Sequence, residues 1–267
     1  MTWKSSRNSF THMTTIVHCY EHDRGYFDFM TSTIRLGEIF PDYVITWAVP
    51  SRRCISEVLD SPNTELFRVP DCSFLALIRD GTEKNEAAFK RFCQRINTLS
   101  LSRDRVFVDF RYGFTCRVDE RLRDMVKFKP ELTAAARSKI AETVGEQYEV
   151  VHCRVGDAEM CEGQRVHLDK YIVSLENYVS QTQLPVLLLS DSVSLKTRMS
   201  GSVKVTTGTP FHSGLHQSGD LSGFVLDVTA IQNAVKVHAI TSLPWGNTSF
   251  SRVPALYAGV PFTVEQI

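Results

Sequence analysis

The sequence has no excess of charge of either sign. Thirty Lys and Arg residues balance thirty Asp and Glu residues in a chain of 267. Proteins that attract nucleic acid or anionic membranes through their overall field carry a surplus of positive charge. The basic residues between Arg117 and Arg123 alternate with acidic ones, which is typical of a solvated surface. The composition therefore argues against nucleic acid and membrane surfaces as partners.

Long apolar runs are also missing. The longest, such as residues 184–189, have the length of a buried strand, whereas a membrane helix needs about 20 apolar residues. Residues 1–8 contain no apolar segment of the kind found in secretory signals. We therefore expect a cytoplasmic protein without a membrane span.

Cysteine pairs are the third absence. The seven cysteines are an odd number and form no Cys-x-x-Cys motif. Several lie in apolar runs, where Cys acts as a small hydrophobic residue. His18, Cys19 and His22 lie close together in the sequence, but no further ligand spacing completes a metal site. We expect no disulfide framework and a reducing compartment.

What the chain does contain is a regular alternation of buried strands and helices. We expect strands at 14–19, 43–49, 73–78, 106–110, 150–153, 184–189, 203–205, 235–240 and 261–264, and helices at 26–40, 83–99, 134–144, 168–179, 224–234 and 250–257. Strands that are apolar throughout and separated by helices predict parallel sheets covered on both faces. We predict an α/β fold of two Rossmann-like halves, residues 1–148 and 149–267, which face a cleft at the carboxyl ends of their strands.

Two segments of the second half carry groups suited to a diphosphate. In residues 150–157 an apolar strand ends in His152, Arg154 and a Gly-Asp turn. Arginine offers a fork of donors that matches phosphate oxygens. Residues 247–252 form a hydroxyl-rich turn before a short helix, and a helix N-terminus is an anion site. Together they predict a pocket for a nucleotide sugar.

The segment from His152 to Asp157 resembles the His-x-Arg-x-Gly-Asp signature of GT-B fucosyltransferases. This superfamily holds the bacterial nodulation α-1,6 enzymes, the α-1,2 enzymes and the protein O-fucosyltransferases. The order downstream also agrees, because a strand ends in Ser190-Asp191, Asp227 opens a helix, and a Thr-Ser-Phe-Ser turn ends at Ser251.

The resemblance covers residues 130–267, whereas the N-terminal half matches only loosely. Residues 22–28 stand where the family has a Gly-rich turn after the first strand. This departure affects contacts on the acceptor side and to the ribose.

The resemblance implies a GT-B-like fold and roles for particular residues. Arg154 would grip the β-phosphate of the donor GDP-fucose. Ser249, Phe250 and Ser251 would present hydroxyl and N–H groups to the same diphosphate. His152 and Asp227 would bind the guanine or the ribose.

The resemblance further implies a metal-independent transfer with inversion, which needs a base for the acceptor hydroxyl. The chain has no Asp-x-Asp pair of the kind that GT-A enzymes use to hold a cation. Asp157, Glu159 and Glu162 are the candidate bases. We favour Glu162, because related enzymes place an acidic residue at about this distance beyond the arginine.

Several of these residues have a purely structural interpretation. Arg154, at the end of a strand, could form a surface ion pair. Ser249 and Asp227 are both residue types that commonly serve as helix N-caps. Asp191 is expected to cap the next helix or to touch the ligand. His212 and His216 are either solvated loop residues or part of a lid.

Three functions follow from the sequence. The first is transfer of fucose from GDP-fucose to a hydroxyl group of a glycan, a protein or another acceptor. The second is a non-catalytic relative that binds a nucleotide or glycan without turnover, in keeping with the unusual turn at 22–28. The third is an unrelated α/β protein that handles a phosphorylated metabolite.

Overall fold

The structure is a computed structural model of the chain. It describes residues 14–20, 25–49, 54–60, 86–110, 118, 120–155, 168–206, 221–242 and 248–267. The strand expected at 73–78 lies outside the described residues.

The N-terminal part contains a small parallel sheet. Its order is β2-β1-β3, built from β1 (Thr15–Cys19), β2 (Val44–Ala48) and β3 (Arg105–Val108). The helices that accompany it are α1 (Tyr26–Ile39) and α2 (Glu86–Ser100), with a short 3-10 helix η1 at Cys54–Glu57. Trp47 of β2 is 4% exposed and belongs to the hydrophobic core.

The C-terminal part contains a five-stranded parallel sheet of order β6-β5-β4-β7-β8. Its strands are β4 (Glu149–Arg154), β5 (Val186–Ser190), β6 (Lys204–Val205), β7 (Lys236–Thr241) and β8 (Phe262–Gln266). The strands β4, β5 and β7 are buried almost throughout, because helices cover both sheet faces. The two parallel sheets confirm the α/β architecture that the alternation predicts.

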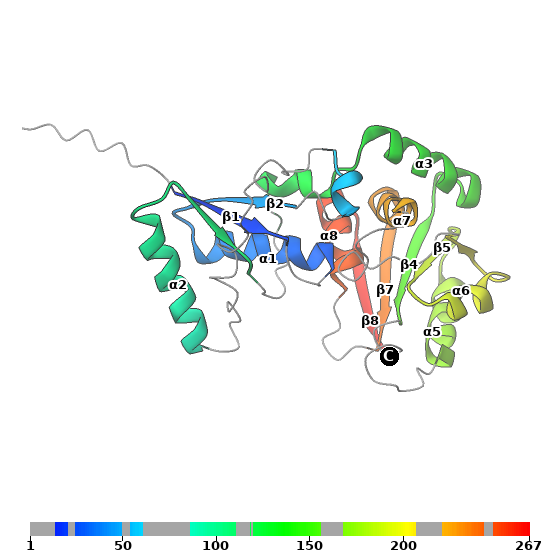
Figure 1. Ribbon diagram of the computed structural model, residues 1–267. Helices are drawn as coiled ribbons and strands as arrows, with labels where there is room; N and C mark the ends of the chain where they lie inside the picture. Colours follow the sequence, from blue (N-terminus) through cyan, green and yellow to red (C-terminus); the bar gives the residue numbers. More distant parts are fainter. Residues whose placement is uncertain are drawn as a thin grey trace, which may run out of the picture.

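The helices of this part divide between the two faces of its sheet (Figure 1). They are α3 (Pro130–Val144), α5 (Leu168–Gln181), α6 (Val193–Met199), α7 (Ser222–Asn233) and α8 (Ser249–Ala258). One core cluster joins Val150 and Leu187 of the sheet to α3, α7 and α8. A second cluster joins Val151 and Leu188, which point to the opposite face, to α5 and α6.

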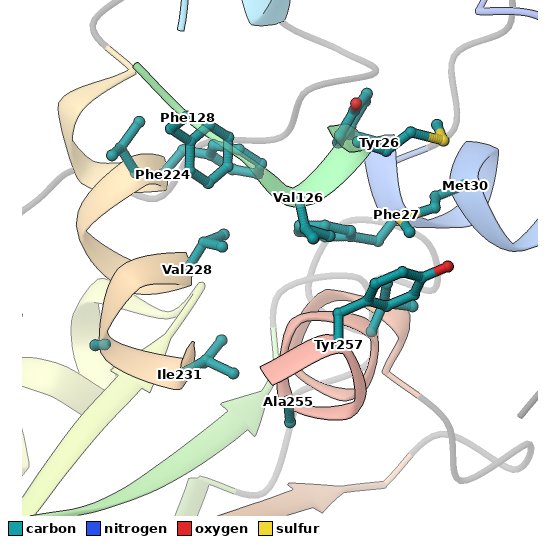
Figure 2. Packing of buried hydrophobic residues seen from close by; sticks show 14 of the residues in the cluster. Tyr26, Phe27, Met30, Val126, Phe128, Phe224, Val228, Ile231, Ala255 and Tyr257 are labelled. Atoms are coloured by element: carbon teal, nitrogen blue, oxygen red, sulfur yellow. The ribbon is translucent and has the colours of Figure 1, made fainter. Parts of the chain in front are cut away.

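The first of these clusters also includes the N-terminal part of the chain. Helix α1 packs against α8 and against the 3-10 helix η4 (Glu120–Val126). Figure 2 shows Phe27 of α1 among side chains of η4, α7 and α8. Its ring stacks on Phe224 at 5.9 Å and meets Phe250 edge-on at 6.0 Å. A single apolar cluster therefore connects the elements around both sheets.

One helix begins earlier than the sequence indicates, and this changes the place of a candidate residue. Helix α7 starts at Ser222, with Leu221 as its N-cap residue. Leu221, Phe224 and Val225 are all buried, so the apolar face that defines this helix extends to its first turn. Asp227 therefore lies inside the helix, and the prediction that it opens the helix is wrong.

Candidate functional site

The candidate residues gather where the strands of the larger sheet end. Strand β4 ends at Arg154, opposite Thr241 of β7, and Cys153 lies opposite Ser190 of β5. Because these strands are parallel, their carboxyl ends lie at one edge of the sheet, which is where open α/β sheets bind ligands.

Arg154 is held in place by Asp191, the residue that follows β5. Its Nη1 lies 3.2 Å from Oδ2 of Asp191, and both side chains are about one-fifth exposed, at 21% and 19%. The other oxygen, Oδ1 of Asp191, accepts a hydrogen bond from the backbone N–H of Val155 at 2.8 Å. One carboxylate thus fixes both the guanidinium and the backbone that carries it.

Asp191 does not cap helix α6, contrary to expectation. The N-cap is Ser192, whose Oγ accepts a hydrogen bond from the backbone N–H of Leu195. Asp191 instead uses both of its oxygens on strand β4 and its continuation. This leaves the capping role to the next hydroxyl residue in the chain.

Tyr171 of helix α5 ties the ends of two strands together. Its hydroxyl donates to the carbonyl oxygen of Arg154 at 2.7 Å and accepts from the backbone N–H of Ser242 at 2.9 Å. Tyr171 is not among the candidate residues that the sequence motifs indicate. An aromatic hydroxyl on the apolar face of an amphipathic helix is the signal that could have identified it, since a buried Tyr O–H needs a partner.

His152 is buried against the beginning of helix α8. Its Nδ1 lies 2.9 Å from Oγ of Ser251 and 3.3 Å from Oγ1 of Thr248, and its ring packs on Phe250 at 5.3 Å. Burial, followed by the positive charges of Arg154 and Lys196, lowers its pKa to about 3. His152 is therefore neutral near pH 7 and positions the start of α8. A contact between His152 and a ligand stays a prediction.

The start of helix α8 has the character of an anion site. Thr248 is the N-cap residue but makes no side-chain cap hydrogen bond, and the first-turn N–H groups of a helix have no partner within the helix. Ser249 is 7% exposed, and its Oγ has no hydrogen-bond partner within the described part of the chain. Residues 152 and 154 project to the same face of the sheet because side chains alternate along a strand, so Arg154 shares that face with α8.

Asp227 presents a carboxylate from the body of helix α7. It is partly buried, and its Oδ1 is closed to solvent and has no hydrogen-bond partner among the described residues. Burial raises its pKa to about 6, opposed by the positive charge of Lys196 and a hydrogen bond from Thr206. Burial thus brings the pKa of Asp227 close to neutral pH, and among the described residues its Oδ1 has no hydrogen-bond partner.

The candidate bases cannot be placed in this site. Asp157, Glu159 and Glu162 lie outside the described residues, as do His212 and His216. Their roles stay predictions.

The described segments contain neither a cluster of metal ligands nor a membrane-spanning helix. They contain no group of three or more His, Cys, Asp or Glu side chains that could hold a metal ion. Nor does any helix in them combine the length and apolar character needed to cross a membrane.

Two further residues, Lys196 and Thr206, lie beside these candidates although no sequence motif indicates them. Lys196 is only 8% exposed, and its Nζ donates to Oγ1 of Thr206 at 3.1 Å. The sequence gives only a weak signal that Lys196 is buried. Lys196 follows the apolar Leu195, but the next two residues, Thr197 and Arg198, are polar.

Comparison with solved structures identifies the fold. The chain is similar to the NodZ α-1,6-fucosyltransferase co-crystallised with GDP, with a TM-score of 0.54 and 14% identity over 92% of both chains. The same enzyme soaked with GDP-fucose gives a TM-score of 0.55 and 15% identity over 92% of both. NodZ from Bradyrhizobium gives 0.55 and 14%, over 91% of this chain and 92% of that one. No protein-family model and no curated protein matches the sequence. The chain has the GT-B-like fold of these fucosyltransferases, as predicted.

Proposed function

We propose that this protein is a glycosyltransferase that transfers fucose from GDP-fucose to a hydroxyl group of a glycan, a protein or another acceptor. The observation that carries the proposal is the joint position of Arg154 and the start of α8 at the carboxyl edge of the sheet. There the Ser249 hydroxyl has no hydrogen-bond partner in the described part of the chain. Solved structures with this fold contain GDP or were soaked with GDP-fucose.

The diphosphate is the part of the donor that this arrangement suits best. In the proposed complex, Arg154 shares its donors between Asp191 and the β-phosphate. Ser249 and the N–H groups of Phe250 and Ser251 hydrogen-bond the same diphosphate. The guanidinium of Arg154 and the N-terminus of α8 would then stabilise the negative charge that develops on the departing GDP.

Asp227 is the proposed acceptor for the guanine. Guanine presents N1–H and N2–H₂ side by side, whereas adenine has no donor at either position. A partly buried carboxylate, with one oxygen that lacks a partner among the described residues, matches that edge. Such an acceptor disfavours a base without a matching donor strongly, because the acceptor then stays unpaired.

The remaining chemistry is a displacement of GDP with inversion at the fucose carbon. The acceptor hydroxyl loses its proton to Glu162 or Asp157 as it attacks, and the C–O bond to GDP breaks. We propose that no metal ion takes part, since Arg154 and the start of α8 supply the positive charge that a cation gives in other glycosyltransferases.

Calorimetric titration with GDP, ADP and UDP in the presence of EDTA tests this proposal. We expect GDP to bind at least about tenfold more tightly than ADP or UDP. Asp227→Ala should lose this preference for GDP. Asp124→Ala, which removes an exposed carboxylate paired with Lys127, should keep it. Equal affinities for the three nucleotides in the parent protein would remove the guanine and fucose assignments.

Donor hydrolysis distinguishes the alternatives. GDP-fucose consumption that persists in EDTA supports a metal-independent transferase, whereas loss in EDTA and recovery with Mn²⁺ contradicts it. GDP binding without any hydrolysis of GDP-fucose identifies a non-catalytic relative. Stabilisation by sugar phosphates without a guanine preference identifies a protein of phosphometabolite chemistry.

A further inference from the structure

Lys196 is a buried cation whose partners connect two helices and the edge of the sheet. The side chain is 8% exposed, and lysine is almost never buried at this level without a partner. Its Nζ donates to Oγ1 of Thr206 at 3.1 Å, and Thr206 directly follows β6. Burial lowers the pKa of Lys196, while the negative charges of Asp227 and Asp191 oppose that shift.

The direction of the hydrogen bonds in this group follows from chemistry. An ammonium group has only donors, so the Thr206 oxygen must accept from Lys196. The hydroxyl proton of Thr206 then points to another acceptor, and Thr206 hydrogen-bonds the carboxylate of Asp227. The result is a one-way chain from Lys196 through Thr206 to Asp227.

This chain leaves one carboxylate oxygen unused. Oδ1 of Asp227 is closed to solvent and lacks a hydrogen-bond partner within the described residues. A buried acceptor without a partner is destabilising, because it has lost its hydrogen bonds to water without replacing them. A ligand that reaches this oxygen with a donor would supply the missing hydrogen bond.

The charges around Asp227 come from three neighbouring elements. Lys196 of α6 acts on it directly. Lys196 is also coupled to Asp191, which pairs with Arg154 at the end of β4. His152 is neutral because its pKa is near 3. Lys196 therefore interacts with two carboxylates. Asp191 holds Arg154, which is proposed to bind the phosphate, and Asp227 is proposed to face the base.

We propose that Lys196 and Thr206 are positioning residues of the nucleobase pocket, which keep Asp227 ionised and oriented so that its Oδ1 accepts a hydrogen bond from a base N–H. This inference rests on the proposed function and extends it to residues that do not themselves touch the nucleotide. Lys196 acts through Thr206, and the discrimination between bases depends on all three.

The test is titration of GDP and ADP into matched variants between pH 6 and 8.5. Lys196→Met removes the cation, so Asp227 takes up a proton at higher pH, and we expect GDP affinity at pH 7 to fall about tenfold or more. Part of that loss should be recovered at pH 8.5. Thr206→Val should also lower GDP affinity and the preference over ADP, whereas Thr206→Ser should retain both.

Two control variants change the same residue types at exposed positions. Lys204→Met lies in β6 and is exposed, and Thr197→Val lies on the exposed side of α6. Both should bind GDP like the parent protein at every pH. If Lys196→Met does not fold, as judged by circular dichroism, the Thr206→Val and Thr206→Ser pair gives the decision.

The outcomes separate the two proposals. If the parent protein binds GDP in preference to ADP and both Lys196→Met and Thr206→Val keep its affinity and pH profile, the positioning role is wrong and the proposed function stands. If the parent protein does not bind GDP, both are wrong.

Discussion

At the scale of single residues, the site depends on side chains that hold others in place. Asp191 holds Arg154, Tyr171 holds the backbone of Arg154, and Ser251 and Thr248 hold His152. Each of these contacts is made before any ligand arrives. Preorganised donors are effective because no energy is spent on orienting them during the reaction.

The first prediction concerns the guanidinium of Arg154. Arg154→Lys keeps the charge but not the planar fork, so the side chain cannot serve Asp191 and a phosphate oxygen at once. We expect kcat/KM for the donor to fall about 100- to 1000-fold, with the melting temperature little changed. Release of GDP from GDP-fucose gives the rate, and Arg198→Lys, at an exposed arginine of α6, should behave as the parent. Near-normal turnover with an unchanged donor KM would exclude Arg154 from the phosphate contact.

At the scale of elements, helix ends fix where the functional groups lie. Helix α8 presents its N-terminus at the carboxyl edge of the sheet and closes at Gly259, which has φ +72°. Helix α3 begins with Pro130 and ends at Gly145, with φ +88° and ψ −173°. Strand β4, which carries Arg154, begins soon after that turn.

The second prediction concerns the turn that leads into β4. No heavy atom lies within 4 Å of a Cβ placed on Gly145 or on Gly201, but only Gly145 has a positive φ. Gly145→Ala therefore costs backbone strain without a clash, about 1–3 kcal/mol of unfolding free energy. Gly201→Ala should change it by less than about 0.5 kcal/mol. Urea unfolding measures both, and equal effects would show that the conformation of Gly145 carries no such cost.

At the scale of the whole molecule, stability should depend on buried neutral histidines. His18 in β1 is fully buried, with Nδ1 2.7 Å from Oγ1 of Thr33 and Nε2 accepting from the backbone N–H of Phe110 at 3.1 Å. Burial lowers the pKa of His18 to about 3, as it does for His152. In each case the folded pKa lies below the unfolded value of about 6.5. The unfolded chain therefore binds a proton that the native protein does not.

The third prediction follows from that sign. The contribution of the neutral histidines to the unfolding free energy is fully present above pH 6.5 and is lost as the pH falls toward 3. Each histidine changes the unfolding free energy by up to about 1.4 kcal/mol per pH unit in this range. His18→Gln should reduce the slope of the unfolding free energy between pH 6 and 4 by about one such contribution. Denaturant unfolding at several pH values measures the slope. Imidazole NMR signals of the parent protein give the pKa itself, and a value near 6.5 would contradict the prediction.

The fold was accessible to sequence reasoning because its signals are local. The apolar runs that form β4, β5 and β7, and the helices between them, each lie within a few consecutive residues. Arg154 and the turn at Ser249 are candidates for the same reason, and their ligand contacts stay predictions. Lys196 gives no such local signal, because its partners Thr206 and Asp227 come from other elements and only packing brings them together. Helix α7 begins two residues before the expected position 224, because the buried N-cap residue Leu221 continues its apolar face.

The cluster around Phe27 has a consequence for how the molecule denatures. Among the described residues, the strands of the first sheet end at Val108 and those of the second begin at Glu149. The hydrophobic interiors do not divide in this way, because α1 packs against α8 and α8 against α7. A fragment that began at residue 149 would lose α3 from the surface of α7 and Phe27 from the rings of Phe224 and Phe250. The folding unit is therefore larger than either sheet. On heating, both sheets should unfold together, and calorimetry should show a single cooperative transition.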